Sequence, residues 1–402
     1  MNSLEKVRKR YYYTGMAGYF LSGICAISNG IIISLLQDHY GFSYGYMGTM
    51  VSAMSVGNML SILTAGVLPG IIGERSTTLI LGSGYFLGYL LIAAAGHPAI
   101  ILASFILLGI ARGLCTNKCT VLVGNHTDNR TKGITLMNSW WSVGALLCPF
   151  LIAGFGMSGA ALHTSFLMQP AGLAAVGLLL WWLFFCAKLP KGSFEEEEKA
   201  GDVKEADKQA SALRYSFLRQ PLFWLLTLLL FCDMGVELSV NGWLVSYYKS
   251  ESILTGVLST YTVTIQWAAI LIGRLMTAFV FRSKRIFRNI FFMSSAVLCT
   301  LLLMVTIRKP IPAIIALIIY SFAIGGIFPT AVSGIGELMN SQSIGIMLSL
   351  GSVSSILFPW LIGIAADHYG LRAGMMVILV PAAGVVLISL FMHRRQRERL
   401  VS

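Results

Sequence analysis

Twelve long apolar segments, divided six and six by one charged stretch, constrain the fold of this chain more than any other feature. The charged stretch, residues 188–219, holds seven acidic and seven basic side chains. A bilayer's hydrocarbon core is about 30 Å thick, and a helix of roughly 20 apolar residues crosses it. We therefore predict membrane-spanning helices at residues 12–37, 44–69, 77–96, 99–124, 133–156, 162–186, 220–247, 252–280, 286–306, 311–335, 343–365 and 374–392.

This pattern predicts an all-α membrane protein with two pseudo-symmetric six-helix bundles. Residues 1–187 form the N-terminal bundle, 188–219 a cytoplasmic linker and 220–402 the C-terminal bundle. The composition agrees, because 56% of the residues are hydrophobic and 11% are charged, against about 25% charged residues in soluble domains. The sequence shows no Walker loop, metal triad or nucleophile elbow. We expect no enzymatic activity, no cofactor and no metal ion.

The net charge of +12 is placed for a membrane protein, not for a nucleic-acid-binding one. Basic residues cluster at 6–10, 188–219, 282–288 and 394–399, outside the apolar segments. Lys and Arg gather in cytoplasmic loops, so both termini are predicted to be cytoplasmic, and some of this charge is available to anionic lipid headgroups. We expect a monomeric, multi-pass protein of a bacterial cytoplasmic membrane, in contact with membrane lipids and without a nucleic-acid partner.

The two halves repeat one another. Residues 142–152 and 352–362 share six identical positions of eleven, including Pro149 and Pro359, at an offset of 210 residues. The pattern Asn-Gly-x-x-x-Ser occurs at 29–34 and again at 241–246, at an offset of 212 residues. Two matches at nearly one offset, in corresponding segments, indicate duplication of a six-helix unit.

Residues 66–75 read Gly-x-Leu-x-Gly-x-x-Gly-Glu-Arg between the second and third apolar segments. This loop resembles the signature loop of the major facilitator superfamily. Gly70 stands where that loop usually has Asp, and Glu74 replaces one usual basic residue. Both replacements change the charges available for the charge relay that the loop normally makes with neighbouring helices. The resemblance implies a twelve-helix carrier whose substrate binds near the middle of the membrane.

Within that superfamily, further segments are similar to the fucose–galactose–hexose permease branch: 136–149, 237–244, 328–330 and 359–370. The resemblance implies transport of a small sugar. The proton-coupled fucose permeases carry acids on the first and fourth helices. Here the first-helix position is Gly30, and the fourth segment offers Arg112 and Lys118, so their proton mechanism does not transfer unchanged.

Asp233, Glu237 and Asn241 follow one another at intervals of four residues. This spacing places them on one helix face, and the resemblance implies that the seventh helix lines the substrate cavity. Two carboxylates in a low-dielectric cavity resist simultaneous ionisation. We therefore predict Asp233 and Glu237 as proton-coupling residues, and Glu237 and Asn241 as substrate-binding residues. The alternative is a fixed ion pair in which one of the acids neutralises Arg112.

Three other charges lie within apolar segments. Arg112 is predicted to bind substrate, because its planar fork suits a carboxylate or phosphate. It could equally exchange carboxylate partners between conformations or form a static ion pair. Lys118 and Arg274 lie nearer the expected cytoplasmic face, and for them snorkelling toward the headgroups is the simpler interpretation.

Uncharged polar and aromatic side chains supply further candidates. Asn29 and Asn241 occupy matching positions of the repeat, and an amide both donates and accepts hydrogen bonds, which suits a polyhydroxylated solute. Asn138 and Gln266 are similar candidates, for which interhelical hydrogen bonding is the simpler explanation. Trp243 is the candidate to stack on a sugar ring.

These observations predict a secondary transporter that moves a small polar solute, a sugar in the first instance, by alternating access, with protons as the coupling partner. Facilitated diffusion is the nearest variant. The alternatives are an organic-anion carrier that uses Arg112, an exporter of drugs or amphipathic compounds, and a non-transporting sensor. Loss of anion binding but not of sugar binding in Arg112→Gln would favour the anion carrier.

Overall fold

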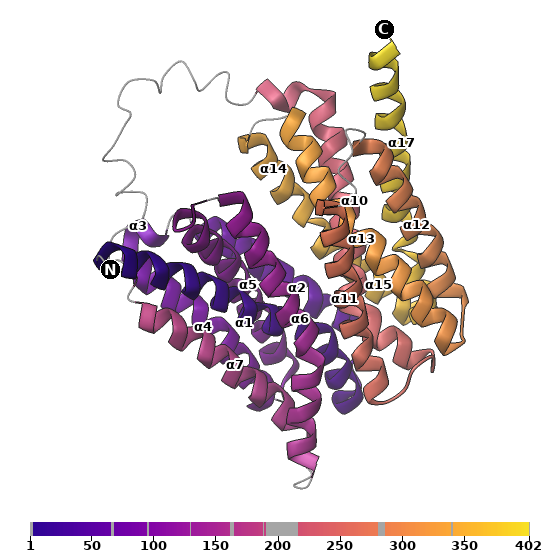
Figure 1. The fold of residues 1–402 in the computed structure, drawn as a ribbon. Helices are drawn as coiled ribbons and strands as arrows, with labels where there is room; N and C mark the ends of the chain where they lie inside the picture. The colour runs from indigo at the N-terminus through magenta and orange to yellow at the C-terminus, as the bar shows by residue number, and fades with distance from the viewer. Residues whose placement is uncertain are drawn as a thin grey trace. The chain divides into compact units, whose positions relative to one another are not determined.

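Figure 1 shows the fold of the chain in a computed structural model. The structure describes residues 3–65, 68–94, 96–128, 130–160, 165–187, 189, 216–279, 286–338 and 341–401. Throughout these residues the regular secondary structure is helical. The helices before the linker are α1 (Ser3–Tyr40), α2 (Tyr44–Ala65), α3 (Leu68–Ile72), α4 (Glu74–Ala94), α5 (Pro98–Asn125), α6 (Arg130–Ala160) and α7 (Ser165–Ala187).

After the linker the chain resumes with the short 3-10 helix η1 (Ser216–Arg219). The α-helices that follow are α10 (Pro221–Ser250), α11 (Val257–Phe279), α12 (Ile286–Thr306), α13 (Pro310–Leu338), α14 (Ser341–Ser352), α15 (Ser354–Tyr369), α16 (Leu371–Met376) and α17 (Leu379–Val401). Most of the predicted linker, residues 190–215, lies outside the described residues.

Ten helical stretches of the described chain are long and apolar enough to cross a membrane. Helices α2 and α11, of 22 and 23 residues, account for the two remaining predicted segments. The predicted eleventh segment is divided at Val353, where the amide of Val353 bonds to Leu350 and that of Ile356 to Val353. Such i→i−3 bonds tighten the turn and interrupt the α-helix. The predicted fold class, an all-α membrane protein, is confirmed.

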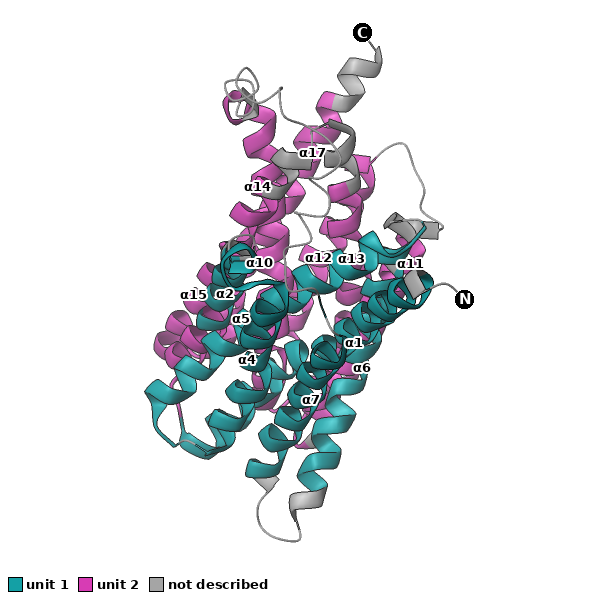
Figure 2. Ribbon diagram, turned by 90° about the vertical axis from the view of Figure 1, so that its left-hand side faces the viewer, with its two compact units in different colours: residues 1–41, 53–203 teal, residues 42–52, 204–402 magenta. Residues whose placement is uncertain are grey.

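The chain divides into two compact units, drawn in teal and magenta in Figure 2. Unit 1 contains residues 1–41 and 53–203, and unit 2 contains residues 42–52 and 204–402. The assignment of residues 42–52 to unit 2 differs from the predicted bundles. It follows from contacts at the start of α2, where the amide of Gly45 donates to Asp367 Oδ2 at 2.7 Å and the Ser52 hydroxyl to Ile356 O at 2.6 Å.

Corresponding helices pack together within each unit, as the sequence repeat predicts. In unit 1, α1 packs against α6, which carries the repeated segment with Pro149. The approach is so close that a Cβ added at Gly144 would lie 2.1 Å from Phe20 O. In unit 2, α10 packs against α15, which carries Pro359. Glycine at these crossings allows the helix backbones to approach closely, and this fixes the rotation of α1 and α10.

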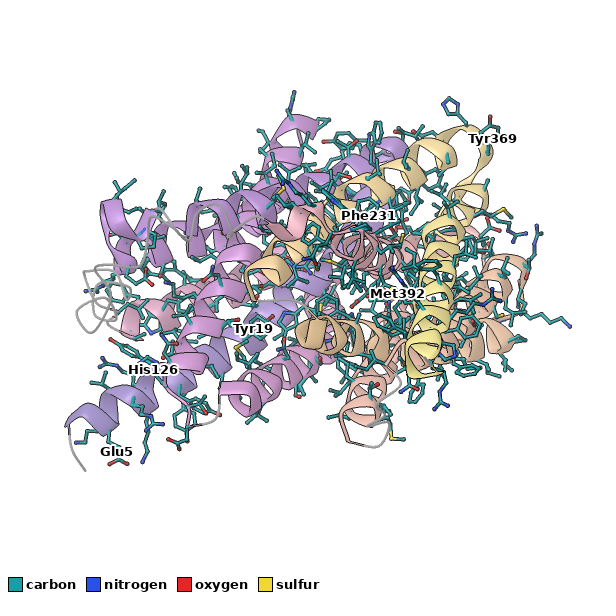
Figure 3. The ribbon with its side chains drawn as sticks, turned by 90° about the horizontal axis from the view of Figure 1, so that it is seen from above. Glu5, Tyr19, His126, Phe231, Tyr369 and Met392 are labelled. Atoms are coloured by element: carbon teal, nitrogen blue, oxygen red, sulfur yellow. The ribbon has the colours of Figure 1, made fainter. Side chains whose placement is uncertain are left out.

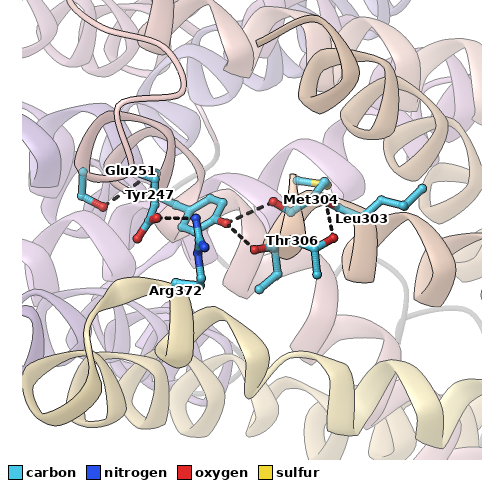
Figure 4. A network of polar contacts seen from close by, with 8 residues as sticks. Tyr247, Glu251, Leu303, Met304, Thr306 and Arg372 are labelled. Atoms are coloured by element: carbon cyan, nitrogen blue, oxygen red, sulfur yellow. Dashed lines mark hydrogen bonds and ion pairs between the residues drawn. The ribbon is translucent and has the colours of Figure 1, made fainter. Parts of the chain in front are cut away.

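Tyrosine and arginine side chains anchor the C-terminal end of α10 (Figure 4). The Tyr247 hydroxyl donates to Met304 O of α12 at 3.0 Å, and Arg372 Nη2 pairs with Glu251 Oε2 at 2.6 Å. The Tyr248 hydroxyl donates to Ala313 O of α13 at 3.0 Å. These contacts hold α10 against α12, α13 and α16 and thereby orient the helix face that carries the predicted acids.

Candidate functional site

The acidic face of α10 starts with Asp233, the most deeply buried acid among the described residues of unit 2. Asp233, Glu237 and Asn241 lie on this one continuous helix, as their spacing predicts. Asp233 is 0% exposed, and neither carboxylate oxygen has a hydrogen-bond partner among the described residues. Burying an ionised carboxylate without a partner costs several kcal/mol. The buried carboxylate therefore requires a proton, a cation or a ligand that offsets the cost of its burial.

Glu237, one turn along α10, has a cationic partner from α11. Arg274 Nη2 lies 3.4 Å from Glu237 Oε1, and the two side chains are 27% and 14% exposed. The guanidinium carbon of Arg274 also lies 5.7 Å from the centre of the Trp267 ring. The interpretation of Arg274 as a snorkelling side chain is thus wrong. The partner that the structure gives Glu237 within unit 2 is Arg274, and the alternative in which one of the acids neutralises Arg112 stays a prediction.

Tyr320 of α13 completes this group, and sequence reasoning missed it. The side chain is 0% exposed, and its hydroxyl has no hydrogen-bond partner among the described residues. It lies close enough to Glu237 and Asp233 for both carboxylates to act on it electrostatically. Asp233 in turn feels Glu237 and Arg274. We call Asp233, Glu237, Arg274 and Tyr320 the acidic cluster.

Two amides of unit 2 keep unused hydrogen-bonding capacity. Asn241 Oδ1 is buried, and it has no partner in the described part of the chain. Gln266 of α11 is 0% exposed, and neither its Oε1 nor its Nε2 has a described partner. Trp243 differs, because its fully buried ring lies 6.3 Å from that of Tyr44 and its indole nitrogen donates to Pro359 O at 3.2 Å. These contacts give Trp243 a packing role, while its stacking on a sugar stays a prediction.

In unit 1 the corresponding feature is a cation, Arg112 of α5. Arg112 is partly buried, and with the residues that the structure describes it forms no ion pair. It lies near enough to the buried Tyr85 of α4 to act electrostatically on its hydroxyl, which shares a hydrogen bond of 3.1 Å with Ser22 of α1. An unpaired cation at this depth of a membrane helix is costly and is a functional candidate by default.

The predicted amides of unit 1 differ in their surroundings. Asn29 of α1 is 8% exposed; its Nδ2 donates to Ala26 O at 2.6 Å, while Oδ1 has no described partner. Asn138 of α6 is exposed and donates to Ile134 O of its own helix at 2.9 Å. Asn29 therefore retains a buried acceptor for a ligand, whereas Asn138 lies on an exposed part of its helix and uses one of its two N–H donors within that helix.

A second, buried ion pair lies in unit 1 and was also missed. Lys118 Nζ of α5 pairs with Glu74 Oε1 at the start of α4, and the two residues are 5% and 4% exposed. The interpretation of Lys118 as a snorkelling side chain is therefore wrong. Glu74 is the residue that departs from the signature loop, so this departure comes with a buried basic partner. An acidic and a basic residue in apolar surroundings indicated that an ion pair could form. Because Glu74 and Lys118 are 44 positions apart in the chain, the sequence did not show that they pair with each other.

A surface cavity of about 320 Å³ lies at one end of unit 1, where Figure 3 labels Glu5 and His126. Its cations are already matched, because Arg8 pairs with Asp128 and Lys9 with Glu5. All four side chains are about half exposed or more. The cavity therefore lacks the unpaired, buried groups that distinguish Arg112 and the acidic cluster.

Two relatives of known sequence match this chain over different lengths. Bypass of stop codon protein 6 of Saccharomyces cerevisiae is 23% identical over 394 residues, which cover 90% of this chain and 77% of the yeast protein. A gallate transporter of Pseudomonas putida is 34% identical over 166 residues, which cover 39% of this chain and 35% of that protein.

Solved transporters share the fold at low sequence identity. A mutant of the nucleoside transporter NupG superposes with a TM-score of 0.73 at 14% identity, covering 97% of this chain and 99% of that chain. A mutant of the E. coli fucose:proton symporter FucP gives a TM-score of 0.61 at 17% identity, covering 94% and 98%. The model of the Major Facilitator Superfamily matches residues 15–342. With ten membrane-crossing stretches and this match over most of its length, the chain belongs to the Major Facilitator Superfamily and is a multi-pass membrane transporter.

Proposed function

We propose that this protein transports a small solute bearing a carboxylate, together with protons, by alternating access. The observation that carries the proposal is Arg112, a partly buried cation in a membrane helix without an ion pair among the described residues. A guanidinium binds a carboxylate through two parallel hydrogen bonds, and such a ligand would remove the cost of the unpaired charge. A relative named as a transporter of gallate, itself a carboxylate, supports this substrate class.

Uncharged groups would bind the remainder of the solute. Asn29 in unit 1 and Asn241 and Gln266 in unit 2 have buried amide atoms without described partners. Such atoms are unfavourable in a low-dielectric interior and gain most from a polar ligand. We assign hydroxyl recognition to these three residues first. Asn138 and Trp243 follow them, because Asn138 is exposed and bonds to its own helix, and the indole N–H of Trp243 already donates to Pro359 O.

Proton coupling is assigned to Asp233 and Glu237. Asp233 is fully buried and has no hydrogen-bond partner in the described part of the chain, and Glu237 lies one turn away with partial exposure. A buried carboxyl group that is neutral when protonated and costly when ionised can link proton binding to a change of conformation.

A neutral sugar is the second candidate. It is favoured by the motifs shared with the fucose–galactose–hexose branch and by the unsatisfied amides, which suit hydroxyl groups. In this alternative Arg112 would not contact the solute. Transport of a carboxylate should therefore depend on Arg112, whereas transport of a neutral sugar should not.

The distribution of basic residues supports both termini on the cytoplasmic side, and we propose a bacterial cytoplasmic membrane as the location. The helices leave many large apolar side chains uncovered, among them Ile80, Phe292 and Leu387 at 60%, 63% and 65% exposure. Such surfaces suit contact with lipid acyl chains. A monomer remains our proposal for the assembly.

The test compares matched pairs of solutes that differ by one carboxylate. Purified protein is reconstituted into liposomes with an imposed inward proton gradient. Uptake is measured for gallate against pyrogallol and for glucuronate against glucose. We expect uptake of an acid but not of its neutral counterpart. Uptake of the neutral partner alone would favour the sugar alternative, and no uptake of any solute would count against both.

The assignment of Arg112 is tested by Arg112→Gln, with Arg308→Gln as the control. Arg308 is exposed in the turn between α12 and α13, so its loss removes the same charge away from the proposed site. Removing one partner of a desolvated charge pair costs about 2–5 kcal/mol, so uptake of the acid should fall by about 30-fold or more in Arg112→Gln. Equal effects of the two substitutions would contradict the assignment.

A further inference from the structure

The acidic cluster of unit 2 contains two carboxylates but one cation. Asp233 and Glu237 are one helical turn apart on α10, and Arg274 is the guanidinium that acts on both. One positive charge can neutralise one carboxylate. In the present conformation it pairs with Glu237 and leaves both oxygens of Asp233 without a described partner.

The contact between Arg274 and Glu237 is a loose one. A single nitrogen of Arg274 lies 3.4 Å from Glu237, whereas strong charge-assisted hydrogen bonds measure about 2.7–2.9 Å and are often bidentate with arginine. The guanidinium also lies over Trp267, at 5.7 Å from the ring centre. An aromatic face stabilises a cation without fixing its position along the ring. Arg274 is therefore held where it can change partners.

Tyr320 provides the second element of an alternative arrangement. Its hydroxyl is fully buried and has no described partner, yet both carboxylates act on it. Buried hydroxyl groups are normally hydrogen-bonded. An ionised Asp233 would supply the acceptor that this hydroxyl lacks in the present conformation.

We propose that Arg274 is the counter-charge of the proton site and moves between Glu237 and Asp233, so that one of the two carboxylates is ionised at a time. This inference rests on the proposed function. In the present conformation Asp233 holds the proton and Glu237 is ionised against Arg274. When the O–H bond of Asp233 breaks, the proton passes to the Glu237 carboxylate, directly or through a water molecule, so that Glu237 becomes neutral as Asp233 becomes ionised. The guanidinium then follows the negative charge to Asp233, and Tyr320 donates to the new carboxylate. Arg274 is thus a positioning residue, and Arg112 is left for the solute.

The titratable groups that face Asp233 belong to the acidic cluster or lie next to Asp233 on α10. Its own helix contributes Glu237 and Cys232, α11 contributes Arg274 and α13 contributes Tyr320. The described residues of α14 carry no titratable side chain. The other elements packed against α10 or its end carry theirs only near their termini: Tyr44 and Tyr46 of α2, Arg219 of η1, Asp367, His368 and Tyr369 of α15, Arg372 of α16 and the residues from His393 onward of α17.

The first test needs no solute. Infrared difference spectra of the purified protein, recorded during a pH titration, report the C=O stretch of a protonated carboxyl group. We expect a band that disappears in Asp233→Asn. Loss of a nearby cation disfavours the ionised form, so in Arg274→Gln the titration of this band should move to higher pH by about one unit or more. Arg274→Lys should restore most of the shift, since it keeps the charge.

The control removes a buried ion pair outside the cluster. The double variant Glu74→Gln/Lys118→Gln eliminates the buried pair of unit 1 and should leave the titration unchanged. A wild-type titration curve in Arg274→Gln would overturn the proposal, and so would a band that persists in Asp233→Asn. Elution as a single symmetric peak in size-exclusion chromatography establishes that each variant is folded.

The second test distinguishes an Arg274 that changes its carboxylate partner from an Arg274 that stays paired with Glu237. Glu237→Gln/Arg274→Gln replaces the pair by two neutral groups and leaves no charge unmatched. If the pair is purely structural, this double variant should accumulate solute as the wild type does, which would contradict the proposal. We expect gradient-driven accumulation of the transported acid to fall about ten-fold, because the counter-charge that follows the ionised carboxylate is lost.

The two tests distinguish failure of this inference from failure of the proposed function. If the wild type shows no proton-driven uptake, the proposed function fails, whatever the infrared result. If the wild type is proton-driven and both Arg274→Gln and the double variant keep its pH dependence, the exchange of partners by Arg274 is wrong while the proposed function stands.

Discussion

The ion pairs of Glu74 with Lys118 in unit 1 and of Glu237 with Arg274 in unit 2 differ in burial, and each unit also holds one membrane-helix candidate residue without a described ion-pair partner, basic in unit 1 and acidic in unit 2. Unit 1 holds the buried pair of Glu74 and Lys118 and the unpaired cation Arg112. Unit 2 holds the looser, partly exposed pair of Glu237 and Arg274 and the unpaired acid Asp233. A tight, buried pair fixes a structure, whereas a loose pair beside an unpaired acid can rearrange. In the proposed function, Arg112 of unit 1 binds the anionic solute, and Asp233 and Glu237 of unit 2 bind the proton.

The buried pair of unit 1 should produce the largest effect on stability. Breaking a buried ion pair on one side costs about 3–5 kcal/mol, because the remaining charge is left uncompensated. Lys118→Gln should therefore lower the thermal unfolding temperature of the purified protein more than the substitutions at Gly144, Gly235, Glu237 or Trp243. Glu74→Gln/Lys118→Gln should recover most of the loss. If Lys118→Gln unfolds at the wild-type temperature, the distinction between the two pairs is lost.

Helix crossings give the next largest effect, and the crossing at Gly144 of unit 1 should be less tolerant than the crossing at Gly235 of unit 2. A Cβ at Gly144 would lie 2.1 Å from the backbone oxygen of Phe20, whereas at Gly235 the nearest atom is Cδ2 of the Phe358 ring, at 2.5 Å. A side chain can turn away, but a helix backbone cannot. Gly144→Ala should cost about 1–3 kcal/mol, the range for overpacking, and Gly235→Ala less. Thermal unfolding of both variants in detergent measures the difference, and the reverse order would refute it.

The loose pair of unit 2 should matter little for stability. Exposed or partly exposed ion pairs contribute about 0–1 kcal/mol, so Glu237→Gln should shift the unfolding temperature far less than Lys118→Gln. Asp233→Asn should be neutral or slightly stabilising, because no described hydrogen bond of its carboxylate is lost. Both variants should nevertheless lose proton-driven uptake. Strong destabilisation of either would indicate a structural acid in place of a proton-coupling one.

The smallest effect is expected at Trp243. Trp243→Phe keeps most of the buried ring and removes the hydrogen bond to Pro359 O. Hydrogen bonds between membrane helices contribute about 0.6 kcal/mol on average, so the unfolding temperature should fall only slightly. If Trp243 serves only in packing, the affinity of the protein for its solute should not change. A large loss of affinity for a sugar, with stability unchanged, would restore the stacking hypothesis.

Much of the fold could be read from the sequence, because membrane insertion depends on local composition. Apolar length alone located the spans, and the repeat predicted which helices correspond. The spacing of Asp233, Glu237 and Asn241 placed them on one face, since helix periodicity is a local property. The division of the eleventh segment at Val353 was missed, because a switch to i→i−3 bonding leaves no clear mark in an apolar run.

The sequence by itself therefore determined which ionisable groups lie within the membrane spans and on which helix faces they stand. Only the tertiary structure decided their partners: Glu74 with Lys118, Glu237 with Arg274, and Tyr320 beside the two acids. Pairing depends on how neighbouring helices are rotated against each other. That rotation is set by close contacts such as the one at Gly144, between residues far apart in the chain, so no local pattern reveals it.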